Sequence, residues 1–399
     1  MHDVALLYGE VAALIAWVVV AASLTALCAW GAALVTVGPI GEATGAHWAE
    51  RARHAYQARK AVTTGAILPP VVIAVFVLSA EPDHGGVTAL VTVLVAFWAS
   101  YPARVYVERR AMPQGMTARD WLRGRFAWWL LMIPHLLITL GLAIVAPRHL
   151  GPGSFALLGL AVASALLVAF GGTLGLARLM GLATPAGPRL AGLAAELAAA
   201  SKQPVPPTYE LDMASANAFA WTRLGAIGVT RRALAALSDD ELRAVLAHEL
   251  GHLAEPRSVA LVRSLGMLAL TPLVLLRPLL ADRLYCPTAV VLWSIVVLLG
   301  LVRVVARRME ARADHAAHAA EGDPGTYARA LAALYVANGM PSVLPGGGRQ
   351  HPHLYDRLVT AGATPDWPRP AAPPSARSRL VMVACVLVTV VVAAVCAST

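Results

Sequence analysis

Long apolar runs alternate with polar, arginine-rich blocks along the whole chain. Each run is close to the ~20 residues that a helix needs to cross the ~30 Å hydrocarbon core of a bilayer. The pattern therefore predicts an α-helical integral membrane protein with about seven or eight spans. The runs cover residues 11–37, 62–80, 87–103, 126–146, 155–177, 259–280, 287–306 and 380–397.

Two of these runs are imperfect. Pro134 and His135 interrupt the fourth run, which is tolerated in a membrane helix where neighbouring helices satisfy the freed backbone groups. In the sixth run, Arg263 and Arg277 bracket only thirteen uncharged residues. That run fits either a short span with snorkelling arginines or half of a re-entrant hairpin.

Composition supports a membrane protein and changes the meaning of the positive charge. The chain is 58% hydrophobic and 14% charged, whereas soluble domains are about half apolar and about a quarter charged. A net charge of +9 would suggest nucleic acid in a soluble protein, but cytoplasmic loops of membrane proteins carry excess Lys and Arg. We therefore expect a lipid bilayer, and no nucleic acid, as a partner.

The basic residues also predict an orientation. Loops 38–61 and 104–125 and polar blocks 178–256 and 307–378 are Arg-rich, whereas the intervening loops have one Arg or none. Under the positive-inside rule this alternation places the N-terminus outside and both polar blocks in the cytoplasm. The expected location is a bacterial plasma membrane.

One segment of the first polar block has the signals of a complete amphipathic helix. Ser238 and Glu241 form a capping box, and Pro256 ends the pattern. Between them, apolar residues recur at helical spacing, at Leu242, Val245, Leu246, Leu250 and Leu253.

This helix carries a His-Glu-x-x-His motif at His248, Glu249 and His252. Residues i and i+4 lie one turn apart on the same face, so both imidazoles can reach one Zn²⁺. Glu249 can then act as a general base on a zinc-bound water. The motif also occurs by chance, so an ordinary helix with two histidines is the alternative.

A catalytic zinc usually has a third protein ligand in addition to water. The best candidate is Glu310, with Asp314 one turn later to orient a zinc-binding imidazole. His315 and His318 are rival ligands. Glu310 could otherwise be a surface residue that pairs with neighbouring arginines.

The sequence resembles the HtpX and CAAX prenyl protease family of membrane zinc metallopeptidases. The resemblance covers residues 209–254, the segment from Glu310 to Asp314, and residues 351–358. Its motifs are Asn-Ala-Phe-Ala at 217–220, Leu-Ala-His-Glu-Leu-Gly-His at 246–252, Glu-x-x-x-Asp at 310–314 and His-Pro-x-Leu-x-x-Arg-Leu at 351–358.

The resemblance implies a small α+β zinc peptidase domain of the gluzincin type, with one Zn²⁺ per chain. It implies that His248, His252 and Glu310 bind the zinc and that Glu249 is the base. It further implies an edge strand that pairs with the substrate backbone and two residues that line the site and stabilise the oxyanion. The strand contains Asn217, Ala218, Phe219 and Ala220, and the other two residues are His351 and Arg357.

These observations predict a domain organisation. Residues 1–177 form a membrane region of about five spans, and 257–306 form a two-span hairpin. The hairpin separates the two halves of the zinc domain, 178–256 and 307–378, and a last span occupies 379–399.

The predicted function is zinc-dependent hydrolysis of membrane or membrane-associated proteins at the cytoplasmic face. One alternative is a sensor-transducer, but the expected outer loops of six or seven residues leave no room for a sensing domain. Another is a non-enzymatic membrane protein such as a transporter, but the spans are nearly free of the charges that such a role favours.

Overall fold

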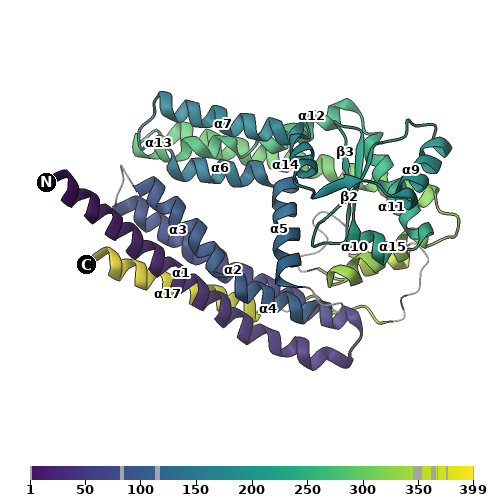
Figure 1. Cartoon of the computed structure of the whole chain (residues 1–399), viewed down its shortest axis with the longest axis horizontal. Helices are drawn as coiled ribbons and strands as arrows, with labels where there is room; N and C mark the ends of the chain where they lie inside the picture. Colours follow the sequence, from purple (N-terminus) through teal and green to yellow (C-terminus); the bar gives the residue numbers. More distant parts are fainter. Residues whose placement is uncertain are drawn as a thin grey trace.

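The computed structural model describes residues 2–80, 85–112, 117–344, 353–360, 365, 367–373 and 376–398. Within this part, six helices are long and apolar enough to cross a membrane, or seven if one sharply bent pair counts as a span. A small mixed sheet lies at one end of the molecule, beyond the long helices (Figure 1). The predicted fold class is therefore confirmed.

The N-terminal helices pack closely through small residues. Ala29, Ala33, Ala55 and Ala58 are fully buried between them, and a Cβ on Gly65 would lie 2.9 Å from the Cys28 carbonyl. Small residues allow close helix approach where lipid offers no hydrophobic drive for association. This group contains α1 (His2–Glu42), α2 (Trp48–Ala80), α3 (Gly85–Ala99), α4 (Tyr101–Ala111) and α17 (Ala376–Ser398).

The fourth apolar run is not one straight span. It is divided between α5 (Ala118–Met132) and α6 (Pro134–Val145), which are bent by 81°. The break follows from Pro134, which cannot continue the hydrogen-bonding pattern of a helix and instead occupies the first turn of α6. As a result α5 runs across the space between the two groups of long helices, on the side of the molecule that faces the sheet (Figure 1).

The sixth apolar run, by contrast, does form a candidate span, Arg257–Ala281. The Arg277 guanidinium donates 2.6 Å to the Ala146 carbonyl, just beyond the end of α6, so its charge is stabilised by the helix C-terminus. The candidate span Arg257–Ala281 belongs to a second group of helices. This group contains α7 (Pro152–Ala169), α8 (Gly172–Leu179), α12 (Arg257–Leu268), α13 (Leu276–Ala281) and α14 (Tyr285–Ala319).

The sheet has the order β1-β2-β4-β3, with β2 and β4 parallel and the other pairs antiparallel. Its strands are β1 (Ala183–Pro185), β2 (Thr208–Leu211), β3 (Ala218–Trp221) and β4 (Ala226–Thr230). β3 is thus an edge strand, as predicted for this segment.

Helices around the sheet complete the core of this domain. Ile227 and Val229 of β4 pack in one cluster with Leu190, Leu242 and Leu246, all nearly inaccessible to solvent. The helices are α9 (Pro188–Ala200), α10 (Arg231–Ala236), α11 (Asp239–Leu253), α15 (Thr326–Asn338) and α16 (Leu354–Thr360).

Candidate active site

Helix α11 presents one face to the core and the other to the site. The predicted capping box is present: Ser238 Oγ accepts from the Glu241 amide, and Glu241 Oε2 accepts from the Ser238 amide at 2.9 Å. Leu242 and Leu246 are fully buried in the core. The helix is therefore fixed in rotation, with His248 and His252 turned toward a neighbouring cavity.

The third residue of the site comes from α14, 58 positions after His252 in the chain. The two helices approach closely because Gly251 has no side chain. A Cβ there would lie 3.2 Å from the Ala313 Cα and from the Ala316 Cβ. This contact places Glu310 opposite the two histidines, and α14 links the site to the apolar part of the same helix.

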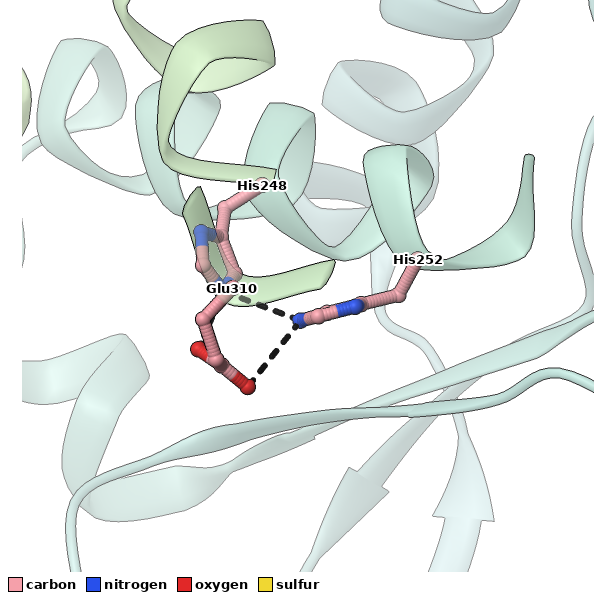
Figure 2. A group of neighbouring side chains, drawn as sticks. All are labelled: His248, His252 and Glu310. Atoms are coloured by element: carbon pink, nitrogen blue, oxygen red, sulfur yellow. Dashed lines mark hydrogen bonds and ion pairs between the residues drawn. The ribbon is translucent and has the colours of Figure 1, made fainter. Parts of the chain in front are cut away.

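His248, His252 and Glu310 converge with their polar atoms toward one point (Figure 2). The two Nε2 atoms are 3.2 Å apart, and Glu310 oxygens lie 3.8 Å from His248 Nε2 and 3.7 Å from His252 Nε2. Tetrahedral ligands bound at ~2.0–2.1 Å lie about 3.4 Å from one another. The three side chains therefore fit a zinc ion.

A hydrogen-bond chain sets the tautomer of His248. Tyr327 Oη donates to Asp314 Oδ1 at 2.8 Å and lies 2.8 Å from His248 Nδ1. Because the Tyr327 proton is used on Asp314, the hydroxyl oxygen accepts a proton from Nδ1–H. His248 Nε2 then presents its lone pair to the metal position. Asp314 therefore lies beside His248, with its Oδ1 3.2 Å from Nδ1, as an orienting role would require.

His252 is oriented in the same way by a different carboxylate. Its Nδ1 lies 2.7 Å from Glu255 Oε1, which also accepts from Arg263 Nη2 at 2.6 Å. Burial alone would lower the pKa of His252, but Glu255 and the nearby Glu249 and Glu310 raise it overall. Zinc binds the neutral imidazole, so a proton on His252 competes with the metal.

Glu249 lies beside these residues, with only 7% of its surface exposed. Burial raises the pKa of its carboxyl above the usual range, and the charge of Glu310 acts in the same direction. The neighbouring histidines oppose this shift. A carboxylate whose pKa is raised toward neutrality is better suited to take up and release a proton during catalysis.

One cavity of about 930 Å³ joins the metal-binding cluster to the edge strand. Its wall includes His248, Glu249, His252, Glu310 and Arg357 on one side and the stretch 214–220 on another. An extended chain paired with β3 would therefore lie in the same space as the metal position.

The remaining predicted residues have different outcomes. Arg357 lies in the cavity wall, and its Nη2 donates to Asp314 Oδ2 at 2.6 Å. His351 lies outside the described residues. The rival ligands His315 and His318 are both exposed and do not join the cluster.

Two partners of the site were missed in the sequence. Glu255 was assigned no role, although its spacing of three from His252 would have suggested a contact. Tyr327 reaches His248 across 79 positions, and no local pattern marks it.

The fold and the site define a membrane zinc metallopeptidase. The family model described as Peptidase family M48 matches residues 187–364. This range includes His248, Glu249, His252 and Glu310. Residues 187–364 therefore form a peptidase domain of the M48 type, and the protein is a membrane metalloendopeptidase. The resemblance noted in its sequence motifs is confirmed.

Removal of the carboxylate that supports His248 should weaken zinc binding. We expect Asp314→Ala to lower zinc affinity by about 10–100-fold, and Tyr327→Phe to have a smaller effect because Asp314 Oδ1 remains 3.2 Å from Nδ1. Competition with a chromophoric chelator measures both affinities. Asp323→Ala, which removes an exposed carboxylate paired with Arg329, is the matched control. Unchanged affinity in folded Asp314→Ala would contradict this role.

Proposed function

We propose that this metallopeptidase hydrolyses peptide bonds of membrane or membrane-associated proteins at the cytoplasmic face, with one zinc held by His248, His252 and Glu310. The observation that carries the proposal is the shared cavity, which places a metal-binding cluster beside a free strand edge. Glu310 is borne by α14, whose N-terminal part is one of the candidate spans. The site is therefore held at the end of membrane helices, where a membrane-associated substrate can reach it.

The proposed substrate is an extended chain that adds to the sheet at β3. Main-chain hydrogen bonds supply affinity in this mode, and alternate side chains supply specificity.

In the proposed chemistry, a bound zinc supplies a Lewis acid that makes water acidic and polarises the scissile carbonyl. Glu249 takes the proton of the attacking water and transfers it to the leaving amine. Arg357 lines the same cavity, and we assign it, with His351, to the oxyanion. The ion pair with Asp314 restrains the Arg357 guanidinium in this position.

The Arg-rich loops support a cytoplasmic site under the positive-inside rule, and membrane vesicles test this orientation. We expect a membrane-impermeant fluorogenic peptide to be cleaved by inside-out vesicles of expressing bacteria and not by sealed right-side-out vesicles. Chelation should abolish the signal, and detergent should reveal it in right-side-out vesicles. Cleavage by intact right-side-out vesicles alone would place the site on the opposite face.

A further inference from the structure

The hydrogen bonds between the edge strand and β4 indicate which backbone groups of the edge strand can still pair with a peptide. Asn217 faces β4, because its carbonyl accepts from the Thr230 amide at 2.9 Å and its own amide donates to Thr230 Oγ1 at 2.9 Å. In a strand, successive residues direct their backbone groups to opposite sides. Ala216, Ala218 and Ala220 therefore direct their amides and carbonyls away from β4, toward the open edge.

The first of these positions is already occupied. Asn338, at the end of α15, accepts from the Ala216 amide through Oδ1 and donates to the Ala216 carbonyl through Nδ2, each at 2.8 Å. Its carboxamide thus makes both of the hydrogen bonds that a peptide would make there. A substrate strand can pair with Ala218 and Ala220, but its ladder ends at Asn338.

Beyond Asn338, where the strand ladder ends, the wall of the cavity carries several basic side chains. Arg59 is fully engaged, since it binds Glu108 at 2.7 Å and donates to the Asn338 and Gly339 carbonyls at 2.9 and 2.8 Å. Arg125 and Lys60 line the same cavity. Within the part of the chain that the structure describes, neither has an ion-pair or hydrogen-bond partner.

The Arg125 guanidinium lies near two indole rings, and no carboxylate among the described residues is within ion-pair distance of it. Its guanidinium lies 5.1 Å from the ring centre of Trp121 and 5.8 Å from that of Trp128, and its Nε is buried without a hydrogen bond. The preceding Gly124 packs against the backbone of Ala214, which anchors α5 at the beginning of the strand edge. A partly desolvated cation is costly unless an anion binds to it.

We propose that Arg125 and Lys60 form a subsite for a carboxylate of the peptide substrate, either its C-terminal group or an acidic side chain. This inference rests on the proposed peptidase function. The subsite lies where the strand ladder must end, so a chain terminus or a turning chain can place its carboxylate there. A terminal carboxylate at this end makes the substrate antiparallel to β3, with the residues after the scissile bond directed toward α5.

The test compares peptides that differ only in this charge. The full-length zinc-loaded protein in detergent is given one fluorogenic peptide as the C-terminal amide, as the free acid, and as amides with Glu at successive positions after the scissile bond. The readout is the ratio of kcat/KM between a charged peptide and the neutral amide. Wild type and Arg119→Gln, an exposed arginine of the same helix, should both prefer a charged peptide by about tenfold.

Substitutions of Arg125 and Lys60 then test whether these two residues cause the charge preference. In Arg125→Gln with Lys60→Gln the ratio should fall to about one, and in Arg125→Glu a peptide with Lys in place of Glu should become the better substrate. A preference for the free acid identifies the terminal carboxylate, and a preference for one Glu position identifies a side chain. No preference in wild type, or an equal preference in the double variant, would overturn the subsite.

A binding measurement keeps the test independent of turnover. Anisotropy of labelled peptides on zinc-loaded Glu249→Gln protein should show the same charge preference and the same loss with the Arg125 and Lys60 substitutions. Charge-selective binding without hydrolysis by the wild type would contradict the proposed function alone. Hydrolysis without charge selectivity would contradict the subsite alone.

Discussion

Glu249→Gln should abolish measurable peptide hydrolysis while the protein retains its zinc. The substitution preserves the shape of the side chain and removes only its ability to take up a proton. General acid–base catalysis contributes about 10²–10⁴-fold to rate, and we expect kcat to fall by at least this factor. Zinc content measured by atomic absorption, with casein cleavage followed in the same samples, tests both parts.

The environment of Glu249 makes this the largest expected effect. The side chain is buried beside both zinc-binding histidines, where few water molecules can replace its carboxylate as a base. Asp240→Asn, at an exposed position in the first turn of the same helix, is the matched control and should leave the rate unchanged. Full activity in Glu249→Gln would show that another group activates the water.

The second large effect is expected for Glu310→Ala, which should lose zinc and activity together. The carboxylate lies within 3.8 Å of both Nε2 atoms and is the only contribution of α14 to the cluster. Loss of a direct ligand should lower zinc affinity by more than the about 10–100-fold expected for an outer partner such as Asp314. The expected metal content is one zinc per chain in the wild type and less in the variant at equal free zinc.

Two comparisons make the result specific to the ligand. Arg308→Ala changes an exposed residue of the same helix and should retain the metal. Chelation of the wild type followed by addition of Zn²⁺ should restore its activity, whereas Glu310→Ala should need much higher zinc. Zinc bound normally in Glu310→Ala would show that Glu310 is not the third ligand.

Local signals in the sequence were sufficient to predict the helix that carries the motif. A capping box and a helical repeat of apolar residues depend on neighbours within four positions, so Ser238, Glu241 and Leu242 specify α11 without reference to the rest of the chain. The candidate spans are predictable for a similar reason, since length and hydropathy are properties of a continuous segment.

The same rules did not predict the bend at Pro134. A proline in an apolar run is compatible with a kinked span, and the run contains no charge in its second half to suggest otherwise. Whether the helix continues or turns depends on what packs against it. Here the break at Pro134 becomes a bend of 81°, and α5 meets the backbone of Ala214 from the peptidase domain through Gly124.

The sequence by itself determined the two histidines, the adjacent base and the membrane character of the protein, because these follow from spacing and composition. It also predicted Glu310 as the third ligand and Asp314 as the residue that orients a zinc-binding imidazole, because the two residues are four positions apart and their motif resembles that of a known family. Only the tertiary structure decided which partners complete the site. Tyr327 and Asn338 act through contacts between segments, and the geometry of such contacts depends on how α11, α14, α15 and the strand edge pack together.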